Sequence, residues 1–103
     1  MTSLPPPIAA YFAATTPGEI AATFTDDATV IDERQLRRGR AEILKWREEV
    51  AAISFTQDIL SVAEIDGKIS VSCRVSGSFP GSPIDLENIF TLSGNLISSL
   101  EIA

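Results

Sequence analysis

One acidic side chain stands out because of its place in the local pattern. Asp32 lies near the end of the segment 24–33, where two acidic turn residues are followed by a short β-branched run. Side chains of a strand alternate between its faces, so Asp32 shares a face with Ala28 and Val30. A carboxylate at the rim of an apolar pocket could remove a proton next to a carbonyl group. Alternatively, Asp32 only ends the strand and pairs in solvent with Arg34, Arg37 or Arg38.

Two more polar residues fall on apolar faces. Tyr11 lies on a helical stripe with Ile8 and Phe12, and it is either an ordinary core tyrosine or a hydrogen-bond donor to a ligand. Asn88 interrupts the apolar alternation of the segment 84–92. A buried amide without partners costs about 1–3 kcal/mol, so we expect a ligand, a water molecule or Tyr11 beside it.

Composition restricts the partners. The 103 residues are 45% hydrophobic and fit one domain, and eight Lys and Arg against fourteen Asp and Glu give a net charge of −6. Nucleic acid and anionic membranes require basic surfaces, so we expect neither as a partner. The arginines at positions 34–40 lack interleaved aromatic residues, which favours a solvated, salt-bridging turn over a phosphate site.

The chain contains no histidine and one cysteine, Cys73. These counts exclude an internal disulfide and catalysis by Ser-His-Asp or Cys-His, and they disfavour zinc, so we expect no metal or cofactor. Cys73 is expected to be a small buried hydrophobic residue. The first seven residues contain no basic segment or long apolar run, so we expect neither a signal peptide nor a membrane span. A cytoplasmic protein is the resulting expectation.

Periodicity predicts helices first and strands afterwards. A helix is expected from Pro7 to about residue 15, then a short one behind the capping box Thr16–Glu19, and a third from Arg40 to about residue 52. Trp46 lies on the apolar stripe of the third helix, which indicates packing rather than a stacking platform. Residues from 53 onward form an antiparallel meander. If the turn 80–83 closes a hairpin, Val75 lies opposite Asn88 and Cys73 opposite Phe90.

This order of parts resembles the nuclear transport factor 2-like superfamily, in particular its SnoaL-like members and the ketosteroid isomerases. The likeness rests on the segments 8–12, 24–30, 39–43 and 75–83 and spans nearly the whole chain. It implies an α+β cone in which three N-terminal helices pack on a curved, mostly antiparallel sheet. The chain is then one SnoaL-like domain, residues 1–103, with residues 1–6 as a flexible leader.

The resemblance also implies roles for residues. The isomerases' catalytic tyrosine falls on Tyr11, their general base on Asp32 and their second acid on Asn88, where an amide replaces the carboxylic acid. A small apolar molecule would be the ligand, and members of the superfamily commonly form homodimers through the outer sheet face. The pocket lining is expected to consist of Phe12, Phe24, Val30, Trp46, Phe55, Cys73, Val75, Phe90 and Leu100.

Two functions therefore compete. The first is an isomerase or cyclase that moves a proton on a small apolar carbonyl compound, with Asp32 as base. The second is a non-catalytic ligand-binding or protein-interaction module with the same fold. A third, an epoxide-opening hydrolase, is disfavoured because neither a second inward carboxylate nor an inward arginine is evident beside Asp32.

Overall fold

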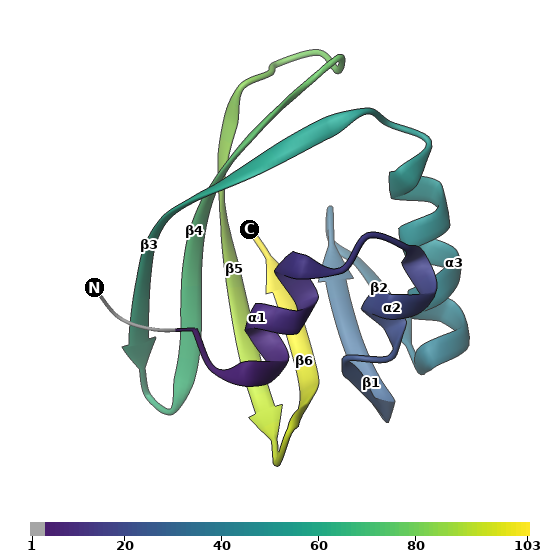
Figure 1. The fold of residues 1–103 in the computed structure, drawn as a ribbon, viewed down its shortest axis with the longest axis vertical. Helices are drawn as coiled ribbons and strands as arrows, with labels where there is room; N and C mark the ends of the chain where they lie inside the picture. Colours follow the sequence, from purple (N-terminus) through teal and green to yellow (C-terminus); the bar gives the residue numbers. More distant parts are fainter. Residues whose placement is uncertain (1–3) are drawn as a thin grey trace.

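The computed structural model describes residues 4–103 and contains three helices and six strands within that range (Figure 1). Residues 1–3 of the predicted leader lie outside the described residues, and helix α1 already begins at Pro6. The elements follow in the order α1 (Pro6–Ala13), α2 (Pro17–Ala21), β1 (Phe24–Asp32), β2 (Gln35–Arg38), α3 (Arg40–Ala51), β3 (Phe55–Ile65), β4 (Lys68–Gly77), β5 (Ile84–Ser93) and β6 (Leu96–Ile102).

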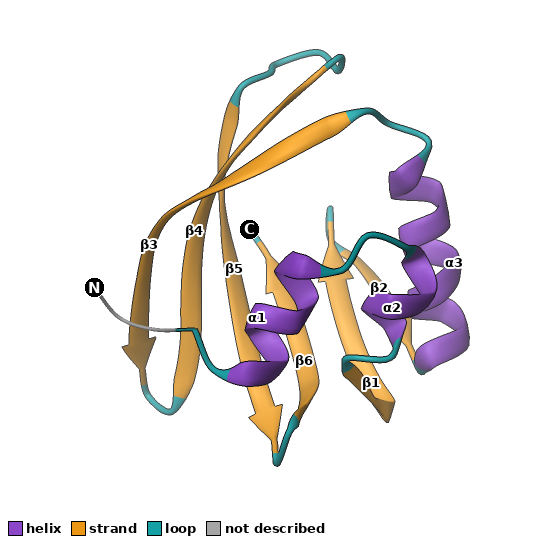
Figure 2. Ribbon diagram, viewed as in Figure 1, coloured by secondary structure: helices purple, strands orange, loops and turns teal. Residues whose placement is uncertain are grey.

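The six strands form one curved sheet in the order β2-β1-β6-β5-β4-β3 (Figure 2). All neighbouring strands are antiparallel except β1 and β6, which are parallel. The predicted α+β, mostly antiparallel layout is therefore confirmed. The helices differ in one respect from the prediction: only α1 and α2 precede the sheet, whereas α3 follows the β1–β2 hairpin.

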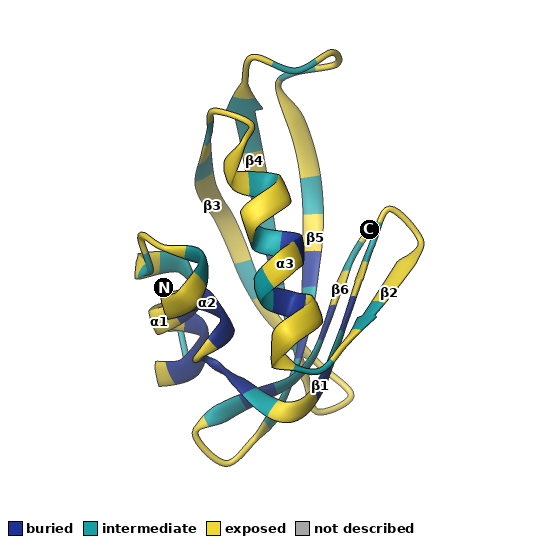
Figure 3. Ribbon diagram, turned by 90° about the vertical axis from the view of Figure 1, so that its right-hand side faces the viewer, coloured by how far each residue is buried: buried dark blue, intermediate teal, exposed yellow. Residues whose placement is uncertain are grey.

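The helices cover the concave face of the sheet, and the core lies between the two layers (Figure 3). Ile8 and Tyr11 of α1, Ile20 of α2, and Ile43 and Trp46 of α3 are buried there. The predicted capping box of α2 is present, since Thr16 Oγ1 accepts a hydrogen bond from the Glu19 N–H and Glu19 Oε1 accepts one from the Thr16 N–H, both at 3.1 Å.

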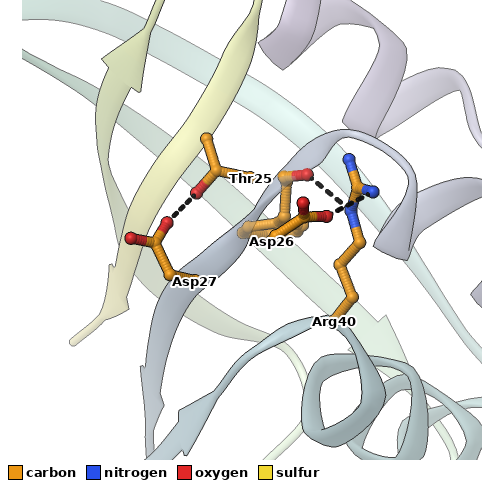
Figure 4. Close-up of polar contacts among 5 residues, drawn as sticks. Thr25, Asp26, Asp27 and Arg40 are labelled. Carbon is orange, nitrogen blue, oxygen red and sulfur yellow. Dashed lines mark hydrogen bonds and ion pairs between the residues drawn. The ribbon is translucent and has the colours of Figure 1, made fainter.

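Arg40 ties the first turn of α3 to the start of β1 (Figure 4). Its Nε donates to the carbonyl oxygen of Phe24 at 2.9 Å, and its Nη1 lies 2.8 Å from Oδ1 of Asp26. The side chain of Asp26 is 90% exposed, so the ion pair itself contributes little and the bond to the backbone contributes more. This contact sets α3 beside β1.

The β4–β5 hairpin pairs in another register than predicted. Asn88 lies opposite Val71, and Val75 lies opposite Ile84 instead of residue 88. The wrong pairs are Val75 with Asn88 and Cys73 with Phe90. The turn itself spans Phe79–Ser82, where the Ser82 N–H donates to the Phe79 carbonyl oxygen at 3.3 Å, and the β4–β5 pairing stops short of it at Val75 and Ile84. Because the shift is an even number of residues, every side chain keeps its predicted face.

The outer face of the sheet is polar along β4 and β5. Glu87 accepts hydrogen bonds from the hydroxyls of Ser70 and Ser72, and Arg74 pairs with Asp85 at 2.9 Å. The homodimer expected through this face stays a prediction. Among residues 4–103, none of the helices has the length and apolar character needed to cross a lipid bilayer.

The close approach of β3 to the end of β4 requires a glycine, which gives a first prediction. A Cβ on Gly77 would collide with the backbone oxygen of Ser54 and lie 2.8 Å from Cβ of Phe55. We expect Gly77→Ala to lower the free energy of unfolding by about 1–3 kcal/mol, measured by urea denaturation. The matched control is Gly18→Ala in α2, where the new methyl group meets nothing within 4 Å and stability should hold or rise. Equal stability of the two variants would contradict the close packing at Gly77.

Candidate functional site

A cavity of about 510 Å³ lies between α3 and the curled part of the sheet. Its polar wall is formed by Asp32, Glu33, Arg47, Gln57 and Asn88 together with Trp46. The remaining wall is apolar and comprises Val50, Ile53, Phe55, Val75, Phe79, Pro80, Ile84, Leu86 and Ile102. Several of these residues are exposed at the rim, so the cavity opens to solvent.

Asp32 is fixed at the end of β1 by the indole of Trp46. Its Oδ2 accepts a hydrogen bond from Trp46 Nε1 at 3.0 Å, and the side chain of Trp46 is only 2% exposed. Arg37 donates to the backbone carbonyl of Asp32 at 3.1 Å, not to its carboxylate. Within the described residues, the carboxylate forms no ion pair, so the solvent pairing considered above is absent.

The turn after Asp32 is strained. Glu33 and Arg34 have φ values of 52° and 65°, in the left-handed region that few side chains adopt. They form the two-residue loop of the β1–β2 hairpin, because Asp32 pairs with Gln35, and such tight loops require positive φ at both positions. Strain of this kind is common at functional sites. Here it ends β1 at the carboxylate and places Glu33 on the cavity rim.

Asn88 reaches the same cavity from β5. It is 4% exposed, and its Nδ2 donates to the carbonyl oxygen of Val71 at 3.2 Å. An amide carries two N–H donors and an acceptor oxygen, so one donor and the oxygen have no hydrogen-bond partner within residues 4–103. The backbone thus satisfies part of the hydrogen-bonding need predicted for this residue.

Tyr11 lines a second cavity, of about 450 Å³, instead of the first. Its hydroxyl accepts a long hydrogen bond of 3.5 Å from Arg47 Nη1. Burial raises the pKa of Tyr11 to about 12, a shift that the nearby Arg47 charge partly opposes, so the hydroxyl keeps its proton at neutral pH. Arg47, Phe55 and Gln57 line both cavities and form the wall between them.

The expected apolar lining is only partly in place. Trp46, Phe55 and Val75 line the first cavity, and Phe12 lines the second. Helix α1 fills the centre of the concave face, where the Tyr11 ring packs edge-on against other aromatic rings at 5.1–6.0 Å. The expected lining residues that lie in this closed core, and border neither cavity, are Phe24, Val30, Cys73, Phe90 and Leu100.

Three polar wall residues were missed, namely Glu33 at the rim, Arg47 and Gln57. Arg47 lies four residues after Ile43, so helical spacing does place it on the buried side of α3. Gln57 lies two residues after Phe55 and therefore shares its face of β3. The expectation that no inward arginine accompanies Asp32 is wrong, since Arg47 and Asp32 line the same cavity. Within residues 4–103, no group of three or more His, Cys, Asp and Glu side chains could hold a metal ion.

Comparison with solved structures identifies close neighbours. The chain is 35% identical to a proposed polyketide cyclase from Sinorhizobium meliloti, with a TM-score of 0.88 over 97% of this chain and 95% of that one. A ketosteroid isomerase-like protein from Catenulispora acidiphila, solved with trimethylamine, is 20% identical, with a TM-score of 0.83 over 98% of this chain and 86% of that one.

A third neighbour is the epoxide hydrolase/cyclase-like enzyme SalBIII, which acts in pyran ring formation in the polyether salinomycin. It is 24% identical, with a TM-score of 0.77 over 93% of this chain and 85% of that one. The likenesses below 25% identity show a shared fold. No protein family model matches the chain, and no curated protein sequence matches it either.

The bond between Trp46 and Asp32 gives a second prediction. In Asp32→Ala the buried indole N–H loses its acceptor, so we expect the free energy of unfolding to fall by about 1–3 kcal/mol. In Asp32→Asn the amide oxygen can still accept, and the loss should be smaller. Trp46 is the single tryptophan, so its fluorescence during urea denaturation follows the site directly. Equal stability of the alanine and asparagine variants would contradict the bond.

Proposed function

Because the chain belongs to the nuclear transport factor 2-like superfamily, among its SnoaL-like and ketosteroid isomerase-like members, we propose that it is a small proton-transfer enzyme. Its reaction is isomerisation or cyclisation of a compact, largely apolar carbonyl compound, without a cofactor. The observation that carries the proposal is the pairing of one indole-anchored carboxylate with a mostly apolar cavity.

In this reaction Asp32 is the general base. Its Oδ2 is held by the Trp46 indole, and its other oxygen removes a proton from the carbon next to the carbonyl of the ligand. The electron pair of the broken C–H bond forms a double bond to the carbonyl carbon while the π pair of the C=O bond moves onto the oxygen, and the second N–H of Asn88 donates a hydrogen bond to that oxygen. Asp32 then returns the proton to another carbon, which leaves the enzyme unchanged.

Tyr11 has a second, more distant role. Its hydroxyl is protonated at neutral pH and already accepts from Arg47, so its own proton is free to be donated. A ligand that extends past Phe55 into the second cavity would meet this donor. Tyr11 therefore positions the far end of the ligand, while Asn88 serves the reacting carbonyl.

A non-catalytic binding module is the alternative. One donor of Asn88 is occupied by the carbonyl oxygen of Val71, and Tyr11 lies outside the first cavity, so few polar groups converge on Asp32. An apolar cavity alone suffices for binding. Epoxide opening is less favoured, because Glu33, the second carboxylate on the wall, is exposed at the rim.

Deuterium exchange separates the enzyme from the module. The probe is 2-tetralone, a compact bicyclic ketone with acidic α-protons, incubated in D₂O and followed by proton NMR. The wild-type protein should accelerate exchange above the buffer rate, and Asp32→Asn should lose about 100-fold or more of that acceleration, since a general base contributes about 10²–10⁴-fold.

The control for this experiment is Asp66→Asn, which changes an exposed carboxylate in the β3–β4 turn by the same chemistry and should exchange the probe like the wild type. Binding of 2-tetralone without any acceleration would favour the module. An Asp32→Asn variant as active as the wild type would exclude Asp32 as the base.

A further inference from the structure

We propose that Arg47 binds a carboxylate of the ligand, so that the site takes an apolar carbonyl compound that is also an organic acid. This inference rests on the proposed function, because it assigns the far end of the molecule whose carbonyl group lies beside Asp32. It concerns substrate class and names a specificity-determining residue.

Arg47 is held in position by aromatic rings. Its guanidinium carbon lies 5.2 Å from the ring centroid of Trp46 and 5.8 Å from that of Tyr11. Contacts of a guanidinium with aromatic rings are favourable, and they fix the charge without using its N–H donors. The cation is thus placed in the wall between the two cavities with its hydrogen-bonding capacity largely unused.

The missing partner of Arg47 is an acceptor. Its Nε is buried and has no hydrogen-bond partner among the described residues, and its Nη1 forms only the 3.5 Å bond to Tyr11. The ion pairs within residues 4–103 join Arg40 to Asp26 and Arg74 to Asp85, so no carboxylate of this part of the chain pairs with Arg47. A buried donor without a partner is costly, and a charged one more so.

A carboxylate is the chemical group that best completes this site. The guanidinium presents parallel N–H donors in a planar fork that matches the two oxygens of a carboxylate. Gln57 lies on the same wall, and its Oε1 is buried without a hydrogen-bond partner in the part of the chain that the structure describes, so a hydroxyl of the ligand or a bound water can donate to it.

In the first cavity, Asp32 and Arg47 are separated by the indole of Trp46. Asp32 accepts from the N–H of Trp46, whereas Arg47 lies over a ring of the same side chain. The two side chains do not pair with each other. A ligand with its carbonyl near Asp32 and Asn88 and its carboxylate on Arg47 would therefore lie along Trp46, with the acidic end away from the base.

Calorimetric titration with three probes of similar shape tests the proposal: 2-naphthoate, 2-naphthamide and 2-acetylnaphthalene. The wild-type protein should bind the carboxylate about 10- to 100-fold more tightly than the amide, the range expected for hydrogen bonds to a charged group. The net charge of −6 repels anions in general, so such a preference would report a local site.

Arg47→Met should bind all three probes with similar affinity, and Arg47→Lys should keep part of the preference. The matched control is Arg38→Met, which removes the same charge from an exposed side chain and should leave the preference intact. If Arg47→Met fails to fold, the lysine variant and the wild-type comparison decide.

The outcomes distinguish this inference from the proposed function. Equal wild-type affinity for the carboxylate and the amide, or an unchanged preference in Arg47→Met, would overturn the assignment of Arg47 and leave the cavity as a site for neutral ketones. Failure of all three probes to bind would overturn both the site and the assignment.

Discussion

The hydrogen bond from the Trp46 indole to the Asp32 carboxylate joins helix α3 to the end of strand β1, and the site depends on it. It holds the Asp32 carboxylate against the almost fully buried Trp46. Without this bond, an acidic side chain at the end of a hairpin would point into solvent. Arg40 fixes the other end of the same helix to the start of the same strand. These two contacts set the distance between the helix and the sheet.

The cavity exists because the helices cover the concave face unequally. Helix α1 fills the centre with Tyr11 and Ile8, so the middle of the sheet is a closed core. Helix α3 lies to one side, and the first part of strand β3 curls over beside the C-terminal end of α3 (Figure 1). The space left between them is lined by Phe55 and Val75 and is divided from the second cavity by Arg47. The close packing at Gly77 keeps this curled part in place.

Local pattern predicted much of this arrangement and missed the parts that depend on distant contacts. Alternation placed Asn88 on the buried face, and the capping box of α2 followed from Thr16 and Glu19. The predicted hairpin register was wrong, because the ladder stops at Val75 and Ile84 and the residues between them form an irregular connection, in which the Gly77 N–H donates to the Ser82 hydroxyl. The alternation of side chains along a strand also determines only the face of the sheet on which a residue lies. Whether that face meets a helix or a cavity is decided by where α1 packs, and for this reason Phe24, Val30, Cys73, Phe90 and Leu100 were expected in the lining and lie in the core.

The central claim, that a carbonyl ligand occupies the cavity between Asp32 and Asn88, is tested most directly by NMR titration of the ¹⁵N-labelled protein with 2-tetralone. The single tryptophan gives one indole N–H signal, which needs no assignment. The account predicts that this signal and the side-chain amide of Asn88 move most. Largest changes on the outer sheet face, around Ser72 and Arg74, or no change at the indole, would contradict it.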